Sequence, residues 1–401
     1  MRNFFLLFFF CLTFLFLLSG CAAPEEQLSG YDPEAREITI AAVLPLSGKY
    51  KADGERMLSG LRYGEYELNS RRGINRKPMK LLVFDSRSTA AGAAEAFTAA
   101  AENNASGVVT GYSTEEAEQI APLADTYRLP AVITMATADS TVGSSPFVFR
   151  NTYSDRQQGE ALGAYLWYWR QLLRISVLMD SDPDHQYERS TARATAAAFK
   201  ELGGTVTNMP AYRGKNYLKA LNEAMITGPQ AIVVSARGAQ AAEIVKTLRA
   251  KGYKGIICGL DSWDTPEFFR AMSSLKNPGD CLYVSFFTPA NRQEEFKDFQ
   301  KGFRQKFFHE PGSCETMSYD ALKLLAIALG NAATRRDLQQ NLESIRNHFG
   351  AAATYTMLPD GNVDRTMYIN AVEPPAVDGT SSRGRLIRSF MHSKLATYRY
   401  D

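Results

Sequence analysis

Histidine and cysteine are scarce in this sequence, and several catalytic motifs are missing. The four histidines (His185, His309, His348 and His392) stand far apart, and no two have the helical spacing of a zinc-binding pair. The chain contains no Gly-x-Ser-x-Gly turn, no phosphate-binding glycine loop and no Gly-x-Gly-x-x-Gly run. These absences argue against a metalloenzyme, an α/β hydrolase and a nucleotide-dependent enzyme. We therefore expect no enzyme activity, no metal and no cofactor.

A strong charge of one sign is also missing. The chain has 45 basic and 43 acidic residues, a net charge of +2, and no basic block stands out. Nucleic-acid-binding proteins usually carry a basic patch or tail. The composition therefore predicts no nucleic-acid partner.

The N-terminus carries the longest apolar run. Arg2 is the only charged residue before "FFLLFFFCLTFLFLLS", which is too short to cross a bilayer comfortably and ends in "LSGC", Leu18 to Cys21. This arrangement resembles the lipobox of bacterial lipoproteins, in which the cysteine becomes the lipidated first residue. The alternatives are a plain signal peptide and a membrane anchor.

The lipobox resemblance implies a signal peptide over residues 1–20, lipidation at Cys21 and a polar tether over 21–36. It also implies a location in the cell envelope, facing the periplasm and held to a membrane by lipid. Ala22 after the cysteine favours an outer membrane, where the cell has one.

Three cysteines remain beyond Cys21, so one disulfide at most can form among them. Cys258 and Cys281 flank successive apolar segments, and an oxidising envelope would permit a bridge between them. A Cys258–Cys281 disulfide and a pair of free buried thiols are the two alternatives.

Apolar, β-branched segments alternate with amphipathic or alanine-rich ones from residue 37 onward. Such an alternation indicates parallel sheets covered by helices on both faces. Two successive sets of it, in a chain too long for one ordinary core, predict two such lobes. The expected strands are 37–46, 79–86, 106–111, 129–135, 174–180, 205–209, 230–236, 255–261 and 281–290. The expected helices between them are 54–71, 90–102, 114–128, 155–171, 186–202, 216–227 and 239–251.

The last part of the chain departs from this alternation. Three helical stretches are expected at 293–309, 315–332 and 335–347, and then two strands around the turn signal Asp360-Gly361. The tail, 372–401, shows no clear pattern beyond "LIRSFM".

Several segments carry a family resemblance. Residues 41–74 ("AAVLPLSGKYKADGERMLSG…"), 111–137, 184–204, 248–263 and 317–329 resemble, in the same order, the branched-chain amino-acid (Leu/Ile/Val) binding proteins of ABC importers. These are type I periplasmic binding proteins. The resemblance covers about residues 38–370, without a large insertion.

The resemblance implies an α/β fold of two doubly wound parallel-sheet lobes joined by three crossovers, with the ligand between the lobes. The crossovers are expected near 151–155, 283–288 and 346–352. The first lobe would contain 37–153 and 286–348, and the second lobe 154–285 and 349–371.

The function implied is that of a lipid-anchored solute-binding protein, which captures an amino acid or similar small polar ligand and delivers it to ABC permease subunits. An alternative is an outer-membrane lipoprotein that uses the same fold to regulate a cell-wall synthase through protein contacts. Ala22 and the additional tail motivate this alternative.

By the same resemblance, the first lobe holds the ligand's α-carboxylate through Ser113 or Thr114, the backbone of Met135, and Thr137. Helix N-terminal N–H groups form an anion site, and a hydroxyl adds a donor. Ser113 or Thr114 could instead simply cap the helix that follows.

On the second lobe, the resemblance implies that Tyr187 covers the ligand and that Asp261 meets its α-ammonium. Arg237 departs from the family pattern, as do Asp53 and Cys314, because members with hydrophobic ligands offer aromatic residues at these positions. The departures disfavour Leu, Ile and Val, and favour a polar ligand with an acidic or amide group. They also suggest an Asp261–Arg237 ion pair in the empty cavity.

We predict that Cys21→Ser abolishes lipidation and leaves the folded part intact, because residues 21–36 carry no core pattern. Partitioning between detergent and water measures this, with the unchanged chain as control. A Ser variant that still enters the detergent phase after signal removal would show that another anchor exists.

Overall fold

The computed structural model describes residues 36–183, 185–375 and 383–399. The expected signal peptide, Cys21 and nearly all of the tether lie outside the described residues. Within the described part of the chain, no helix has the length and apolar character needed to cross a membrane.

The first lobe is built on a sheet of five parallel strands in the order β2-β1-β3-β4-β5. They are β1 (Ile38–Leu44), β2 (Met79–Asp85), β3 (Gly107–Thr110), β4 (Ala131–Ile133) and β5 (Val148–Arg150). Ile40 and Ala42 of β1 enter one hydrophobic cluster, whereas Ala41 and Val43 enter another. Because successive side chains of a strand point to opposite faces, helices must cover both faces.

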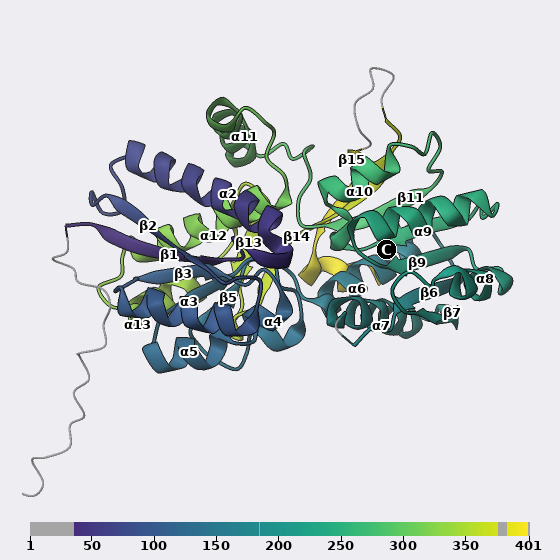
Figure 1. Ribbon diagram of the computed structural model, residues 1–401, viewed down its shortest axis with the longest axis horizontal. Helices are drawn as coiled ribbons and strands as arrows, with labels where there is room; N and C mark the ends of the chain where they lie inside the picture. Colours follow the sequence, from purple (N-terminus) through teal and green to yellow (C-terminus); the bar gives the residue numbers. More distant parts are fainter. Residues whose placement is uncertain (1–35, 184, 376–382, 400–401) are drawn as a thin grey trace, which may run out of the picture.

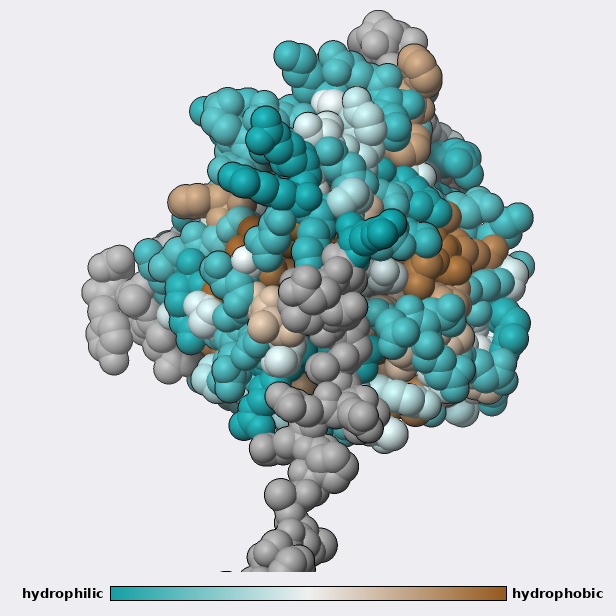
Figure 2. All heavy atoms as spheres, turned by 90° about the vertical axis from the view of Figure 1, so that its left-hand side faces the viewer, coloured by the Kyte–Doolittle hydropathy of each residue, from teal (hydrophilic) through white to brown (hydrophobic). Residues whose placement is uncertain are grey.

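Helices cover the first sheet on both sides (Figure 1). On one face lie α2 (Lys51–Ser70), α12 (Ser313–Leu329) and α13 (Arg335–Glu343). On the other lie α3 (Ala90–Glu102) and α5 (Ile120–Tyr127). The short α4 (Thr114–Ala117) precedes α5, and α11 (Glu294–Phe307) packs on α2 through Phe299 and Tyr63. Figure 2 views the outer end of this lobe, which is mostly hydrophilic with scattered apolar patches.

The second lobe repeats this three-layer arrangement. Its parallel strands are β6 (Arg174–Asp180), β7 (Thr205–Asn208), β8 (Ala211–Tyr212), β9 (Ala231–Ser235), β10 (Ile256–Gly259) and β11 (Cys281–Ser285). One face is covered by α6 (Asp155–Ala164), which continues as the π-helical η3 (Tyr165–Trp169), and by α7 (Gln186–Glu201). The other is covered by α8 (Leu218–Ile226), α9 (Gly238–Ala250) and α10 (Pro266–Met272). The predicted α/β fold of two helix-covered, largely parallel sheets is confirmed.

The C-terminal part adds antiparallel strands. β14 (Val363–Glu373) pairs with β11 and with β15 (Arg383–Met391), which leads into η5 (His392–Arg399). The tail, in which the sequence showed no clear pattern, therefore contributes a strand to the second lobe. A smaller hairpin, β12 (His348–Phe349) and β13 (Thr354–Met357), pairs with the start of β14.

The third crossing lies further along the chain than expected. Tyr355, Met357 and Val363 share a hydrophobic cluster with β1 and α12, so they pack with the first lobe. Met367 and Ile369 belong to the cluster of β6 and β9. The assignment of 349–371 to the second lobe is therefore contradicted for residues 353–363, and the chain crosses within β14.

Cys258 and Cys281 are free, buried thiols in the structure. Ile257 pairs with Cys281 and Cys258 with Leu282, so the two cysteines are offset by one residue in neighbouring strands. Cys258 packs on the α6–α7 face and Cys281 on the opposite face. A disulfide requires side chains that point toward each other, so the structure supports the free-thiol alternative.

Arg365 joins the three crossings. Its side chain is fully buried in β14, and Nη1 donates to the Asn151 carbonyl oxygen (2.8 Å) in the first crossing. Nη2 donates to the Phe286 carbonyl oxygen in the second crossing. The guanidinium also lies among aromatic rings, at 5.3 Å from the Tyr355 ring and 5.7 Å from the Tyr153 ring.

We predict that Arg365→Met lowers the free energy of unfolding by about 3 kcal/mol or more, since it leaves two buried carbonyl groups without their charged donor. Urea unfolding followed by circular dichroism measures the change. The control is Arg385→Met on β15, whose side chain is 61% exposed and pairs with Glu373. An equally small change in both variants would contradict this role of Arg365.

Candidate functional site

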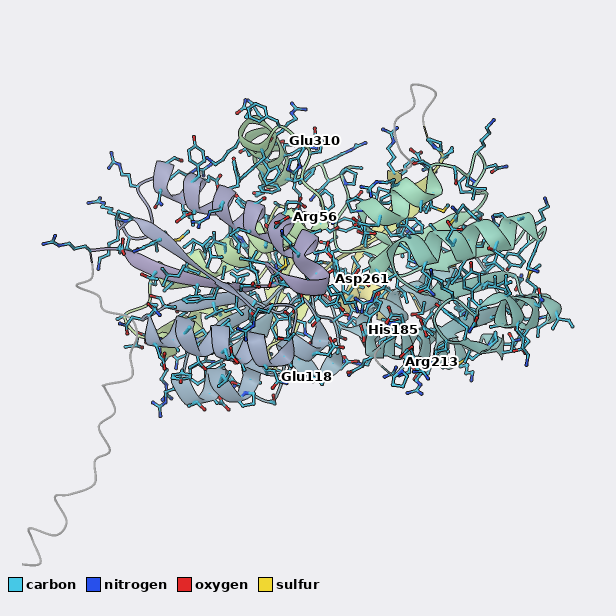
Figure 3. The ribbon with its side chains drawn as sticks, viewed as in Figure 1. Arg56, Glu118, His185, Arg213, Asp261 and Glu310 are labelled. Atoms are coloured by element: carbon cyan, nitrogen blue, oxygen red, sulfur yellow. The ribbon has the colours of Figure 1, made fainter. Side chains whose placement is uncertain are left out.

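A cavity of about 640 Å³ lies between the two lobes. The first lobe contributes the start of α2, the β3–α4 and β4 ends, and the start of α12. The second lobe contributes the start of α7, the β9–α9 turn and the β10–α10 segment, which contains η4 (Asp261–Trp263). These are carboxyl ends of parallel strands, where α/β sheets place their ligands. Figure 3 shows Arg56 and Asp261 where the lobes meet.

All seven residues predicted to bind ligand line this cavity: Ser113, Thr114, Met135, Thr137, Tyr187, Arg237 and Asp261. The fold thus brings together positions that are far apart in the sequence. That they bind a ligand stays a prediction.

The β3–α4 corner forms the polar wall of the first lobe. Ser113 caps α4, because its hydroxyl accepts from the Glu116 N–H (3.3 Å) and Glu116 accepts from the Ser113 N–H (3.1 Å). Ser113 is therefore the N-cap of α4, as the capping alternative predicted. The Thr114 hydroxyl, at the next position, has no hydrogen-bond partner among the described residues. Thr114 lines the same cavity, so this hydroxyl is available to donate to an anion there.

The segment after β4 was expected to hold the ligand's α-carboxylate through the Met135 backbone and Thr137, and it fits this expectation only in part. The Met135 N–H donates to the Gly111 carbonyl oxygen at 3.1 Å, so the predicted carboxylate contact through this N–H is wrong. The Thr137 carbonyl oxygen accepts from Arg150 Nη1 (3.0 Å) and from the Asp155 N–H (2.8 Å). These bonds tie Thr137 firmly to the first crossing.

Asp261 is the buried acid of the second-lobe wall. It begins η4, directly beyond β10, and is 7% exposed. Its Oδ1 accepts a hydrogen bond from the Tyr187 hydroxyl. Burial raises the pKa of Asp261 to about 7, while the Tyr187 bond opposes the rise.

Close packing fixes the turn that carries Asp261. The Trp263 ring lies over Gly259, where an added Cβ would come within 2.0 Å of it. Thr265 caps α10 by accepting from the Phe268 N–H at 3.2 Å. A side chain at position 259 would push this ring and the acid out of place.

Arg237, at the N-cap of α9, pairs with Glu188 and not with Asp261. Its Nε donates to Glu188 Oε1 at 2.5 Å, and its guanidinium carbon lies 4.4 Å from the centre of the Tyr187 ring. The expected Asp261–Arg237 ion pair is therefore wrong. Glu188 directly follows Tyr187 in the sequence, but only the α7 geometry shows that it reaches Arg237.

Asp53 and Arg56 form a second polar cluster, on α2. Arg56 Nη1 donates to Asp53 Oδ1 at 2.8 Å, and the Tyr112 hydroxyl donates to Asp53 Oδ2 at 2.5 Å. Cys314 lies 4.0 Å from Asp53 Oδ1. Asp53 and Cys314 were singled out from the sequence, whereas Arg56 and Tyr112 were missed, because their proximity depends on how α2 packs.

Two hydrogen bonds join the lobes across the cavity. Arg56 Nη2, on α2, donates to Glu267 Oε1, on α10, at 3.0 Å. The Ser313 hydroxyl, at the start of α12, donates to Asp264 Oδ2 at 2.6 Å. These residues were not foreseen, since the sequence gives no sign of contacts between distant loops.

The described residues contain no group of three or more His, Cys, Asp or Glu side chains placed to hold a metal ion. The carboxylates of the cavity instead accept hydrogen bonds from hydroxyl, guanidinium and backbone groups of the protein.

A family model described as periplasmic binding protein matches residues 37–379. A search of curated proteins gave no match. The chain is similar to the substrate-binding protein of a branched-chain amino acid transporter from Streptococcus pneumoniae, solved with isoleucine. This structure is 22% identical, covers 88% of this chain and 99% of its own, and has a TM-score of 0.75.

Two further structures share the fold. One is a leucine-, isoleucine-, valine-, threonine- and alanine-binding protein from Brucella ovis, in a closed conformation. It is 18% identical, the alignment covers 90% of this chain and 96% of the other, and the TM-score is 0.78. The other is a solute-binding protein of an ABC transporter from Rhodopseudomonas palustris, in complex with 3,4-dihydroxybenzoic acid. It is 15% identical, the alignment covers 89% of this chain and 98% of the other, and the TM-score is 0.75.

We predict that Glu267→Gln shifts the protein toward a more open arrangement of its lobes. The Arg56 and Glu267 side chains are 23% and 43% exposed, so their ion pair stabilises the contact between the lobes by up to about 1 kcal/mol. Its loss should therefore change the ratio of open to closed forms by about fivefold at most. Spin labels at the exposed positions Glu102 and Lys219 report the distance between the lobes.

The control for this experiment is Glu243→Gln, which removes the same charge from a pair within α9. The same distance distribution in Glu267→Gln as in this control would show that the Arg56–Glu267 pair does not hold the lobes together.

Proposed function

The chain belongs to the periplasmic binding protein family, and from this membership we propose a lipid-anchored solute-binding protein that serves an ABC importer. Its fold is that of the solute-binding proteins of ABC transporters. It would capture an amino acid or a similar small polar ligand between its two lobes and release it to permease subunits. We propose no enzyme activity for it.

One observation carries this proposal: the two walls of the cavity offer opposite kinds of polar group. The first-lobe wall has the Thr114 hydroxyl at the β3–α4 corner, beside Thr137. The second-lobe wall has the Asp261 carboxylate. An α-amino acid carries an acceptor carboxylate and a donor ammonium on one carbon, so it complements both walls at once.

The energy of the ammonium contact is large enough to select such ligands. A carboxylate about 4 Å from an ammonium gains roughly 4 kcal/mol at an effective dielectric near 20, before desolvation is subtracted. The Tyr187 hydroxyl orients Asp261 through its hydrogen bond to Oδ1. A deaminated analogue would gain none of this energy.

The proposed location follows from the N-terminal sequence. Lipid at Cys21 would hold the protein in the cell envelope, facing the periplasm, and Ala22 favours an outer membrane where one exists. The tether over 21–36 would separate the folded part from the membrane surface. A cavity lined by groups from both lobes supports a solute receptor more than a regulator that acts through protein contacts alone.

We predict that Asp261→Asn weakens the binding of an amino-acid ligand by at least about tenfold, 1.4 kcal/mol, while the binding of its deaminated analogue changes little. Asparagine keeps an acceptor for the Tyr187 hydroxyl and removes only the charge. Isothermal titration over the proteinogenic L-amino acids and their deaminated acids measures both. Equal losses for the two ligands would mean that Asp261 supports the fold and does not contact the ammonium.

The pH dependence gives a second readout for the same variant. Asp261, whose pKa is about 7, is surrounded by Tyr187, Arg237 and the Asp155 carboxylate. Below this pH it holds a proton, which it must lose to pair with an ammonium, so affinity should rise from about pH 5.5 to 8 and then level off. Asp261→Asn should flatten this rise.

A further inference from the structure

Arg237 presents a guanidinium to the cavity in a fixed orientation. Its Nε donates to Glu188 Oε1, and its guanidinium carbon lies over the Tyr187 ring, 4.4 Å from the ring centre. Glu188 is 3% exposed, so this partner is firmly placed. Two contacts on different sides restrict the rotamers of a side chain that is otherwise flexible. The group is therefore preorganised before any ligand arrives.

The two terminal nitrogens of Arg237 have no protein acceptor. Glu188 engages only Nε, and no other hydrogen bond of the guanidinium forms with the described residues. The side chain is 44% exposed and lines the cavity, so a ligand atom can reach Nη1 and Nη2. Although burial alone would lower the pKa of Arg237, Glu188 raises it, so the group is charged.

The other guanidinium of the cavity, that of Arg56, is already matched. Its Nη1 bonds Asp53 and its Nη2 bonds Glu267. Asp53 is also matched, since its second oxygen accepts from Tyr112. Among the guanidinium groups of the described cavity wall, that of Arg237 therefore has both Nη atoms available to donate to a ligand.

Several carboxylates line the same cavity, and they bear on which charge a ligand can carry. Asp264 accepts hydrogen bonds from the Ser285 and Ser313 hydroxyls. Glu315 accepts from the Gly312 N–H within the α12 capping box, and Glu310 on the rim pairs with Arg304. Each of these carboxylates has a donor from the protein, whereas the terminal nitrogens of Arg237 have no protein acceptor among the described residues. Arg237 is therefore the better partner for a charged group on a ligand side chain.

Asp261 and Arg237 lie at two sides of one aromatic ring. Asp261 meets the hydroxyl of Tyr187, whereas Arg237 lies over the face of its ring. A ligand whose ammonium meets Asp261 can therefore extend its side chain along Tyr187 toward Arg237. The group at the end of that side chain would meet two parallel N–H donors and a positive charge.

We infer that the ligand carries a second acidic group on its side chain, as in an amino dicarboxylate, and that Arg237 is the residue that selects it. The inference rests on the proposed function, because Asp261 sets the orientation of the ligand. A planar carboxylate accepts two parallel hydrogen bonds from a guanidinium, which an amide or an alkyl group cannot do.

Titration calorimetry with matched pairs of probes tests this inference. The pairs are L-glutamate with L-glutamine, and L-aspartate with L-asparagine; L-2-aminoadipate extends the series by one methylene. The folded chain should bind at least one acidic probe about tenfold more tightly than a neutral counterpart, and Arg237→Gln should remove this preference. Arg237→Lys, which keeps the charge but not the planar fork, should retain part of it.

The matched control is Arg213→Gln on the second lobe, away from the cavity (Figure 3), where Arg213 is 69% exposed and pairs with Asp182. It should change no affinity, and thermal melting of all variants verifies that they fold. Tight binding of a neutral amino acid, with equal losses for every probe in Arg237→Gln, would overturn the inference and leave the proposed function standing. No binding of any amino acid, acidic or neutral, would overturn the proposed function and the inference with it.

Discussion

The Arg365 guanidinium connects the three places where the chain passes between the lobes. It is buried and forms no ion pair with a carboxylate of the described residues, and its charge is solvated by the carbonyl oxygens of Asn151 and Phe286 and by the faces of aromatic rings. An uncompensated buried charge costs several kcal/mol, so these groups must stay around it. The three crossings are thus held as one unit, and we expect the lobes to pivot on it.

The same unit positions the cavity. The Asn151 side chain donates to the Met317 carbonyl oxygen at 2.8 Å, and Met317 belongs to the first turns of α12, which supplies Ser313 and Cys314 to the cavity. Phe286 lines the cavity directly. The walls that would hold the two ends of a ligand are therefore attached to the pivot, and a change at Arg365 should reach both of them.

Much of the fold could be predicted from the sequence, because alternation of apolar strands and amphipathic helices is a local signal. The residues of the cavity wall were implied by the family resemblance, and not by the local pattern alone. The wrong prediction of an Asp261–Arg237 ion pair concerns a contact that depends on tertiary geometry, because only the fold brings Glu188 of α7 to Arg237 at the N-cap of α9. The choice between a disulfide and free thiols at Cys258 and Cys281 likewise depends on a one-residue offset between β10 and β11. β15 was missed because arginines at 383, 385 and 388 and its exposure hide the apolar pattern.

The weakness of the direct contacts between the lobes would let a bound ligand control closure under the proposed function. The Arg56–Glu267 pair is half-exposed, and the Ser313–Asp264 bond joins a hydroxyl to a carboxylate that also serves Ser285. The ion pair contributes up to about 1 kcal/mol, and the hydroxyl–carboxylate bond about 1.5 kcal/mol or somewhat more. By the proposed function, a ligand that meets Thr114 on one wall and Asp261 with Arg237 on the other would make more charged contacts in a closed form than in an open one. Since a ligand shifts a conformational equilibrium only by its difference in affinity for the two forms, these contacts across the cavity, and not the direct bonds between the lobes, would decide when the protein closes.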